Sequence, residues 1–161
     1  MRDVGKNNYN KTFSVKKSID EVLNLVKLNQ KSFIYSIKLD LPEEIKISGK
    51  KIVFQGLLFK LLKNANQAYS FIDVQNKIIL VTSKVEDSNR ISLSVTCGGK
   101  GLSFLEKTIK KDSILLFREN SSDCNIRQIS QTLKKEFKGK MEIISKKNKG
   151  STLKCYFPLN Q

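Results

Sequence analysis

The segment SVTCGGKGLS, residues 94–103, ends a strand-like run in a glycine-rich turn. Ile91, Leu93 and Val95 occupy alternate positions before the turn, which is the period of a half-buried strand. Closely spaced glycines after a strand bring bare backbone to a phosphate group or an adenine ring. Such turns normally carry an acidic residue that contacts the ligand, and here Cys97 stands in its place. The segment is therefore a working nucleotide site, a degenerate one, or only a turn.

Two features of the composition exclude several kinds of chemistry. The chain has no histidine, so it has no imidazole base, no Ser–His pair, no histidine metal ligand and no phosphohistidine. Its three cysteines, Cys97, Cys124 and Cys155, form no CxxC pair. That odd number argues against a disulfide framework and against a zinc site. We assign no catalytic residue.

The formal charge of +15 at pH 7 suggests nucleic-acid binding, because lysine and arginine displace counterions from phosphates. Yet only four of the 30 basic residues are arginine, the side chain favoured for reading bases and buried phosphates. A solvated lysine coat explains the charge better. A basic nucleic-acid-binding module remains our third hypothesis.

The 161 residues are enough for one domain with a single core. No apolar run approaches the ~18 residues of a membrane span, and the N-terminus lacks the apolar segment of a signal peptide. We therefore expect a cytoplasmic protein. Residues 1–12 are polar and are expected to be a flexible N-terminal segment, followed by a domain at 13–161.

Hydrophobic periodicity predicts an alternation of helices and strands along the domain. The expected elements are a helix at 14–30 with Ser14 as N-cap, a strand at 32–42, a helix at 48–71, a hairpin at 76–97, a lid-like segment at about 98–124 with a short helix around 103–110, a helix at 125–139 with Gly139 as C-cap, and a hairpin at 140–159. This order predicts an α+β fold, a two-layer sandwich in which three helices cover one face of a mixed, mostly antiparallel sheet.

The two later helices have apolar positions that suggest an inward face. In the helix at 48–71 the shared face is expected to hold Ile52, Val53, Gly56, Leu57, Lys60, Leu61, Asn64 and Ala68. In the helix at 125–139 the inward residues are expected to be Ile126, Ile129, Leu133 and Phe137.

Three segments occur in a characteristic order: FQGLLFKLLKNANQAY, then VTCGGKGL, then the stretch from residue 116 to 159. They resemble the asparagine box, the first glycine box, and the run from the ATP lid through the second glycine box to the closing hairpin of sensor histidine-kinase ATPase domains. That family belongs to the GHKL superfamily, with the Bergerat fold. The resemblance covers roughly residues 13–159.

The resemblance implies a site for Mg-ATP and also points to what is missing from it. Asn64 matches the family's magnesium ligand, whereas Lys60 replaces the other asparagine and, as a donor-only ammonium, cannot accept a metal bond. Gly99 and Gly101 are kept in the first glycine box. Cys97 replaces the aspartate that accepts the adenine amino proton, and losing such a charge-assisted bond costs about 1.5–3 kcal/mol.

The second glycine box departs further from the family pattern. Its three glycines fall on Ser122, Cys124 and Ile126, and its leucine falls on Arg127. A β-branched isoleucine offers neither close backbone approach nor easy positive φ. Arg118 and Arg127 could supply replacement cations, but point charges do not rebuild a cradle of amides. The resemblance thus implies a remnant nucleotide site.

We therefore expect a degenerate histidine-kinase-like ATPase domain acting as a binding or regulatory module in two-component-type signalling. No cofactor is expected, with Mg-ATP bound, and Asn64 as its metal ligand, only if the site still functions. The expected partner is a response regulator or a histidine kinase. The alternative is a divergent, active histidine-kinase catalytic domain that binds Mg-ATP and phosphorylates a histidine in trans.

Overall fold

The computed structural model describes residues 11–29, 33–69, 77–98, 121–146 and 150–159. The elements, in chain order, are β1 (Thr12–Ser14), α1 (Val15–Asn29), β2 (Phe33–Asp40), β3 (Lys46–Ser48), α2 (Lys51–Ala68), β4 (Lys77–Asp87), β5 (Arg90–Cys97), α4 (Ser121–Phe137), β6 (Lys140–Lys146) and β7 (Gly150–Pro158). None of the described helices is both long enough and apolar enough to cross a membrane.

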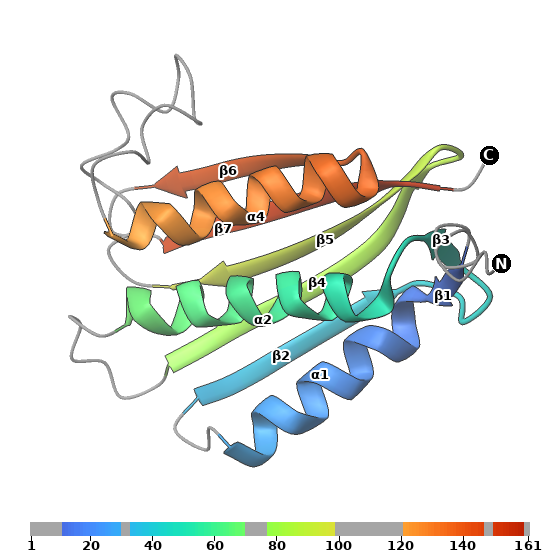
Figure 1. Ribbon diagram of the computed structural model, residues 1–161. Coiled ribbons are helices and arrows are strands. Elements are labelled where there is room, and N and C mark those ends of the chain that lie inside the picture. The colour runs from blue at the N-terminus through green and yellow to red at the C-terminus, as the bar shows by residue number, and fades with distance from the viewer. Residues whose placement is uncertain (1–10, 30–32, 70–76, 99–120, 147–149, 160–161) are drawn as a thin grey trace, which may run out of the picture.

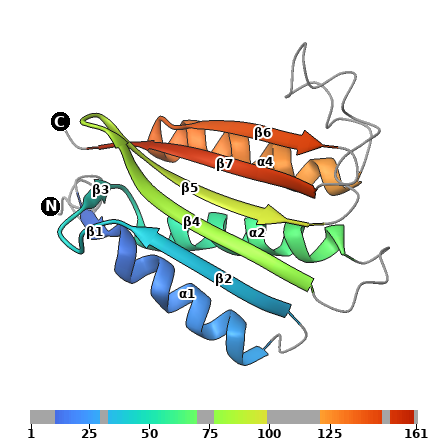
Figure 2. The ribbon, with the colours of Figure 1, turned by 180° about the vertical axis from the view of Figure 1, so that it is seen from behind.

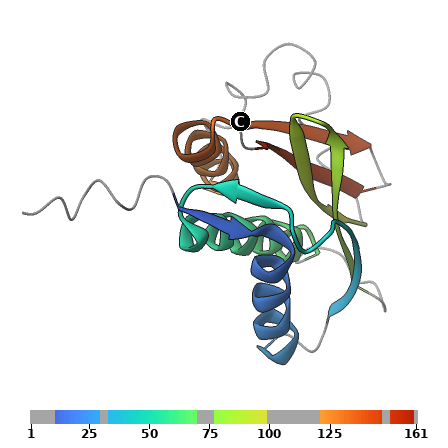
Figure 3. The same cartoon turned by 90° about the vertical axis from the view of Figure 1, so that its right-hand side faces the viewer.

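The main sheet has five strands in the order β2-β4-β5-β7-β6. β2 and β4 run parallel, and the other three pairings are antiparallel. Helices α1, α2 and α4 lie side by side on one face of this sheet, as the front and side views show (Figure 1, Figure 3). The predicted α+β sandwich with three helices on one face of a mixed sheet is therefore confirmed for the described residues.

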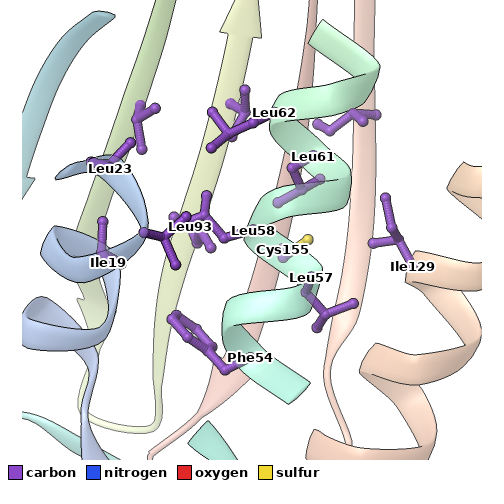
Figure 4. Close-up of a cluster of buried hydrophobic side chains, with 14 of the residues drawn as sticks. Ile19, Leu23, Phe54, Leu57, Leu58, Leu61, Leu62, Leu93, Ile129 and Cys155 are labelled. Atoms are coloured by element: carbon purple, nitrogen blue, oxygen red, sulfur yellow. The ribbon is translucent and has the colours of Figure 1, made fainter. Parts of the chain in front are cut away.

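The core fills the space between the helix layer and the sheet. Figure 4 shows Leu58 and Leu61 of α2 between Ile19 of α1 and Ile129 of α4, and each of these side chains is fully buried. Such burial contributes about 1.5–3 kcal/mol for each side chain. An aromatic cluster closes the core near the start of α2, where the ring centroids of Phe54 and its neighbours are 5.1–6.5 Å apart. Its members are Phe13, Phe54, Phe137 and Phe157.

A second, two-stranded sheet joins β1 to β3 and was not predicted. Thr12 pairs with Ser48, and the Gly49 amide donates to the carbonyl oxygen of Lys11 over 2.9 Å. This small sheet holds the beginning of α1 beside the beginning of α2. Of the N-terminal segment expected at 1–12, residues 1–10 lie outside the described residues, and Thr12 belongs to β1.

The helix ends agree with the sequence in one case and differ in another. Ser14 caps α1 as predicted, since its Oγ accepts the Lys17 amide at 3.4 Å. At the end of α4, however, the residue with positive φ is Lys138 (φ 55°), and the Gly139 amide donates to the Leu133 carbonyl oxygen over 3.0 Å. The helix also begins at Ser121, four residues before the expected start at 125.

The inward face of α2 is rotated from the expected one. Ile52, expected to point inward, is 77% exposed, whereas Phe54, Leu58 and Leu62 are buried. Because α2 is apolar on several sides and packs between two helices and a sheet, spacing alone did not define which side is innermost. The inward residues expected for α4 are all buried, namely Ile126, Ile129, Leu133 and Phe137.

Candidate functional site

Four element ends meet at one end of the sandwich. The last turns of α2 and the end of β5 lie beside the beginnings of α4 and β7, as opposite views of the ribbon agree (Figure 1, Figure 2). The strand register places Cys97 of β5 directly opposite Ser151 of β7. This arrangement brings the helix expected to carry the asparagine box and the start of the glycine-rich turn into one region, which we call the remnant site.

Cys97 and Ser151 form a neutral pair at the floor of the remnant site. The Cys97 Sγ lies 3.3 Å from the Ser151 Oγ and 3.7 Å from the Ser151 carbonyl oxygen. Their exposed fractions are only 3% and 7%. A thiol and a hydroxyl that satisfy each other supply no negative charge, so this pair lacks the strong acceptor that an aspartate would give.

Tyr69, at the end of α2, is hydrogen-bonded to the first backbone amide after β5. The Gly98 amide donates to the Tyr69 hydroxyl at 2.6 Å, and that hydroxyl donates to the Ile78 carbonyl oxygen at 2.5 Å. Burial raises the pKa of the Tyr69 phenol, which keeps it protonated and able to act in both bonds. The amide of Gly98 is therefore engaged within the protein rather than turned toward a ligand.

Lys60 and Asn64 are both half-buried on α2, one helical turn apart. Lys60 lines a cavity of about 390 Å³ with Val26 and Asn29 of α1, so part of its surroundings is on the α1 side of the helix. Asn64 does not line that cavity. The structure thus places the two asparagine-box positions on one helix without showing them around a common metal position.

The beginning of α4 occupies the place expected for the second glycine box. Ile126 is 2% exposed and belongs to the hydrophobic core, and its neighbour Arg127 is exposed. A buried isoleucine within a helix fills its space with side chain, and its backbone lies in the helix. At this position the protein has core packing where a phosphate cradle needs bare amides.

Three of the candidate residues, Gly99, Gly101 and Arg118, lie outside the described residues, as does most of the expected lid at 98–124. In the parts of the chain that the structure describes, no group of three or more Cys, Asp or Glu side chains could hold a metal ion. Cys155 is fully buried, and burial raises its pKa to about 12, so its thiol stays protonated at neutral pH.

Sequence reasoning missed Ser151 and Tyr69. Ser151 is separated from Cys97 by 54 residues and meets it only because β5 and β7 are neighbours in the sheet. The glycine before Ser151 and the alternation of the closing hairpin are the signals that could have placed this hydroxyl on the inner face. Tyr69 lies at the end of the asparagine-box helix, and an aromatic hydroxyl close to a core usually has a partner.

The fold is similar to those of solved histidine-kinase structures, although no protein-family model and no curated protein sequence matches the chain. The nucleotide-free catalytic domain of histidine kinase ThkA gives a TM-score of 0.72 at 19% identity, covering 94% of this chain and 98% of that domain. The mycobacterial sensor histidine kinase MprB gives 0.69 at 13% identity, with coverages of 94% and 98%.

AdeS, a histidine kinase of Acinetobacter baumannii, gives a TM-score of 0.63 at 15% identity, covering 94% of this chain and 68% of the AdeS chain. A longer ThkA chain, of which this protein covers 42%, was crystallised in complex with the response regulator protein TrrA. The described elements thus match the arrangement that the motif order implied. This chain has the fold of the catalytic domains of histidine kinases.

Proposed function

We propose that this protein is a degenerate histidine-kinase-type ATPase domain that acts as a protein-binding, regulatory module in two-component-type signalling in the cytoplasm. The observation that carries the proposal is the buried, neutral pair of Cys97 and Ser151 at the end of β5. It stands where an adenine-binding carboxylate is expected, and it offers a purine amino group only weak acceptors.

Two further observations support weak or lost ATP binding. Ile126 packs in the core at a position where glycine is expected, and the Gly98 amide is engaged by Tyr69. The loss of one charge-assisted bond costs about 1.5–3 kcal/mol, which is a factor of roughly ten to a hundred in affinity. With the phosphate contacts also reduced, Mg-ATP at cellular concentration leaves the site largely empty.

Binding a protein partner is the role that remains for a domain whose ATP binding is weak or lost. ThkA, whose catalytic domain shares this fold, was crystallised with a response regulator. We propose a partner of that kind, or a histidine kinase, for this chain. No histidine is available here for self-phosphorylation.

The second candidate function, a divergent active kinase domain, is favoured by one feature. Asn64, the residue matching the family's magnesium ligand, is kept and is not fully buried on α2. If it ligates magnesium, then Mg-ATP would be the cofactor and the other remnant-site residues (Lys60, Cys97, Gly99, Gly101, Arg118 and Arg127) would contact the nucleotide.

Thermal unfolding with millimolar Mg-ATP separates the two functions. A ligand at 100 times its dissociation constant stabilises a protein by about 2.7 kcal/mol, or roughly 5–10 °C for a domain of this size. We expect no shift beyond that given by Mg²⁺ with inorganic phosphate. A saturable, magnesium-dependent shift that Asn64→Ala abolishes would establish the kinase alternative.

A further inference from the structure

A groove runs between α1 and α2, and the remnant-site pair of Cys97 and Ser151 takes no part in it. Its cavity of about 390 Å³ is lined by the apolar side chains of Val26, Phe59 and Leu62 and by the polar residues Asn29, Lys60, Lys63 and Asn66. We call this feature the α1–α2 groove.

Helical spacing extends the apolar lining along α1. Gln55 of α2 donates to the Ser18 carbonyl oxygen at 3.2 Å and to the Glu21 carboxylate at 2.8 Å, which identifies the side of α1 that faces α2. Leu25 follows Glu21 by four residues, so it continues the same side, and it is 53% exposed.

The facing side of α2 has the same pattern. Ile52 and Phe59 lie three residues before and four residues after Gln55, and they are 77% and 43% exposed. The polar contacts of Gln55 close one end of the interface between the helices. Beyond them Leu25 of α1 and Phe59 of α2 present exposed apolar side chains beside the hollow. Exposed apolar side chains gathered beside a hollow are typical of a binding site.

The charge around the open part of the groove has one sign. After Glu21, α1 contains no acidic residue and α2 contains none along its length, whereas Lys60 and Lys63 line the cavity. Lys51 is paired with Glu21 at 2.8 Å. Within the described part of the chain, Lys60 and Lys63 have no acidic partner. An occupant with negative charge beside its apolar face would complement this rim.

We propose that the α1–α2 groove binds an amphipathic helix of a partner protein, with its apolar face on Leu25 and Phe59 and its acidic residues beside Lys60 and Lys63. This inference rests on the proposed protein-binding function and adds the surface and the chemistry of the partner. Grooves between helices receive helices through side chains spaced i, i+3, i+4 and i+7. A second copy of this chain is disfavoured because each copy carries a charge of +15. A flat membrane surface does not fill a hollow.

The probe is a pair of designed peptides of five helical turns, about 18 residues. Both have leucine at helical spacing; one has glutamate on its polar face and the other has lysine. Each is titrated into the ¹⁵N-labelled full chain without nucleotide, and amide chemical shifts are recorded. The acidic peptide is expected to shift amides of residues 22–29 and 55–66 and to bind at least about tenfold more tightly than the lysine peptide.

Three variants make the test specific. Phe59→Glu is expected to weaken binding of the acidic peptide by at least about tenfold. Ile144→Glu, at a 48% exposed position on β6, is expected to leave it unchanged. Lys63→Glu tests the rim at an exposed position. It is expected to weaken binding of the acidic peptide and to strengthen binding of the lysine peptide. Amide dispersion and the unfolding temperature verify that each variant is folded.

The proposal is overturned if neither peptide binds at about 1 mM, if both bind equally, or if the shifts fall on the sheet. It is equally overturned if Phe59→Glu binds as the unaltered chain does. Sedimentation with phosphatidylglycerol vesicles that depends on Phe59 would assign the groove to a membrane instead. Because nucleotide is absent, ATP binding in the thermal test would refute the proposed function while leaving this result interpretable on its own.

Discussion

The Sγ of Cys97 lies 3.3 Å from the Oγ of Ser151, across the β5–β7 ladder and almost out of contact with water. The two groups satisfy each other without charge. Any change that introduces a carboxylate here must therefore bring an ion into a space built for two small neutral side chains. This relationship determines what introducing an aspartate at position 97 would achieve.

We expect Cys97→Asp to destabilise the protein and to leave ATP binding undetected. A carboxylate at a 3% exposed position loses its hydration, and the Ser151 hydroxyl alone compensates only part of that loss, so unfolding should become easier by about 1–3 kcal/mol or more. We expect nucleotide binding to stay weak, because Ile126, which is buried in the core, stands where the resemblance places a glycine. Urea unfolding and calorimetric titration with Mg-ATP measure the two effects.

The control for this substitution is Cys97→Ser, which keeps a small neutral group that can bond to Ser151. It should lower the free energy of unfolding by less than Cys97→Asp does, and it should also show no ATP binding. Full recovery of Mg-ATP binding by Cys97→Asp alone would mean that the phosphate contacts are intact and that Cys97 is the single defect.

Tyr69→Phe should destabilise the protein by about 1–3 kcal/mol, because it removes the partner of both the Gly98 amide and the Ile78 carbonyl oxygen. The phenyl ring remains, so core packing against Phe33, at a centroid distance of 6.0 Å, is preserved. Urea unfolding measures the loss, and faster hydrogen exchange at the Gly98 amide locates it.

Tyr156→Phe is the matched control, since its hydroxyl donates to the exposed Glu142 carboxylate at 2.8 Å on the outer face of the sheet. We expect a change below about 1 kcal/mol there. Equal losses in the two variants would show that the Tyr69 bonds have no special role at the end of α2.

The sequence predicted the layers of the fold because most elements have one clear apolar side. Ile19, Val22 and Val26 recur at helical spacing in α1, and the alternation before Cys97 identified β5. The small β1–β3 sheet escaped prediction because each strand has three residues and is stabilised by pairing with a distant segment. For α2, apolar residues on three sides left the orientation of the helix open.

The site was predictable only in part, for a related reason. The glycine-rich turn located Cys97, yet the partners of the turn come from other elements. Tyr69 lies 29 residues from Gly98, and Ser151 lies 54 residues from Cys97. Local patterns report which residues share a helix face or a strand face. They do not report which strands become neighbours, and the Cys97–Ser151 pair depends on that order.

Acid should weaken the protein partly through Glu86. Its pKa is lowered by hydrogen bonds from Lys154, at 2.9 Å, and from Ser92. A lowered pKa in the folded state means that this contribution is complete above the unfolded glutamate value, about 4.3, and is lost as pH falls further. Glu86→Gln should therefore cost about 1 kcal/mol at pH 7, and the difference from the unaltered protein should vanish in acid.

The dependence of stability on pH in the basic range follows from the same pair. Glu86 raises the pKa of Lys154, so the contribution of this lysine is complete below the unfolded value of about 10.4 and is lost above it. Urea unfolding measured from acidic to basic pH tests both predictions. The control is Glu44→Gln at an exposed position, for which a change below about 0.5 kcal/mol is expected at any pH. A Glu86→Gln effect that persists unchanged in acid would contradict the assignment.

Gly139→Ala and Gly56→Ala should have opposite effects on stability. A Cβ at Gly139 would lie 2.2 Å from the Tyr156 carbonyl oxygen and 2.7 Å from the Leu133 side chain. The end of α4 would have to move from β7, at a cost of about 1–3 kcal/mol. At Gly56, inside α2, a Cβ meets nothing within 4 Å, so alanine should stabilise the helix by about 0.5–1 kcal/mol. Urea midpoints moving the same way in both variants would contradict the close approach of α4 to β7.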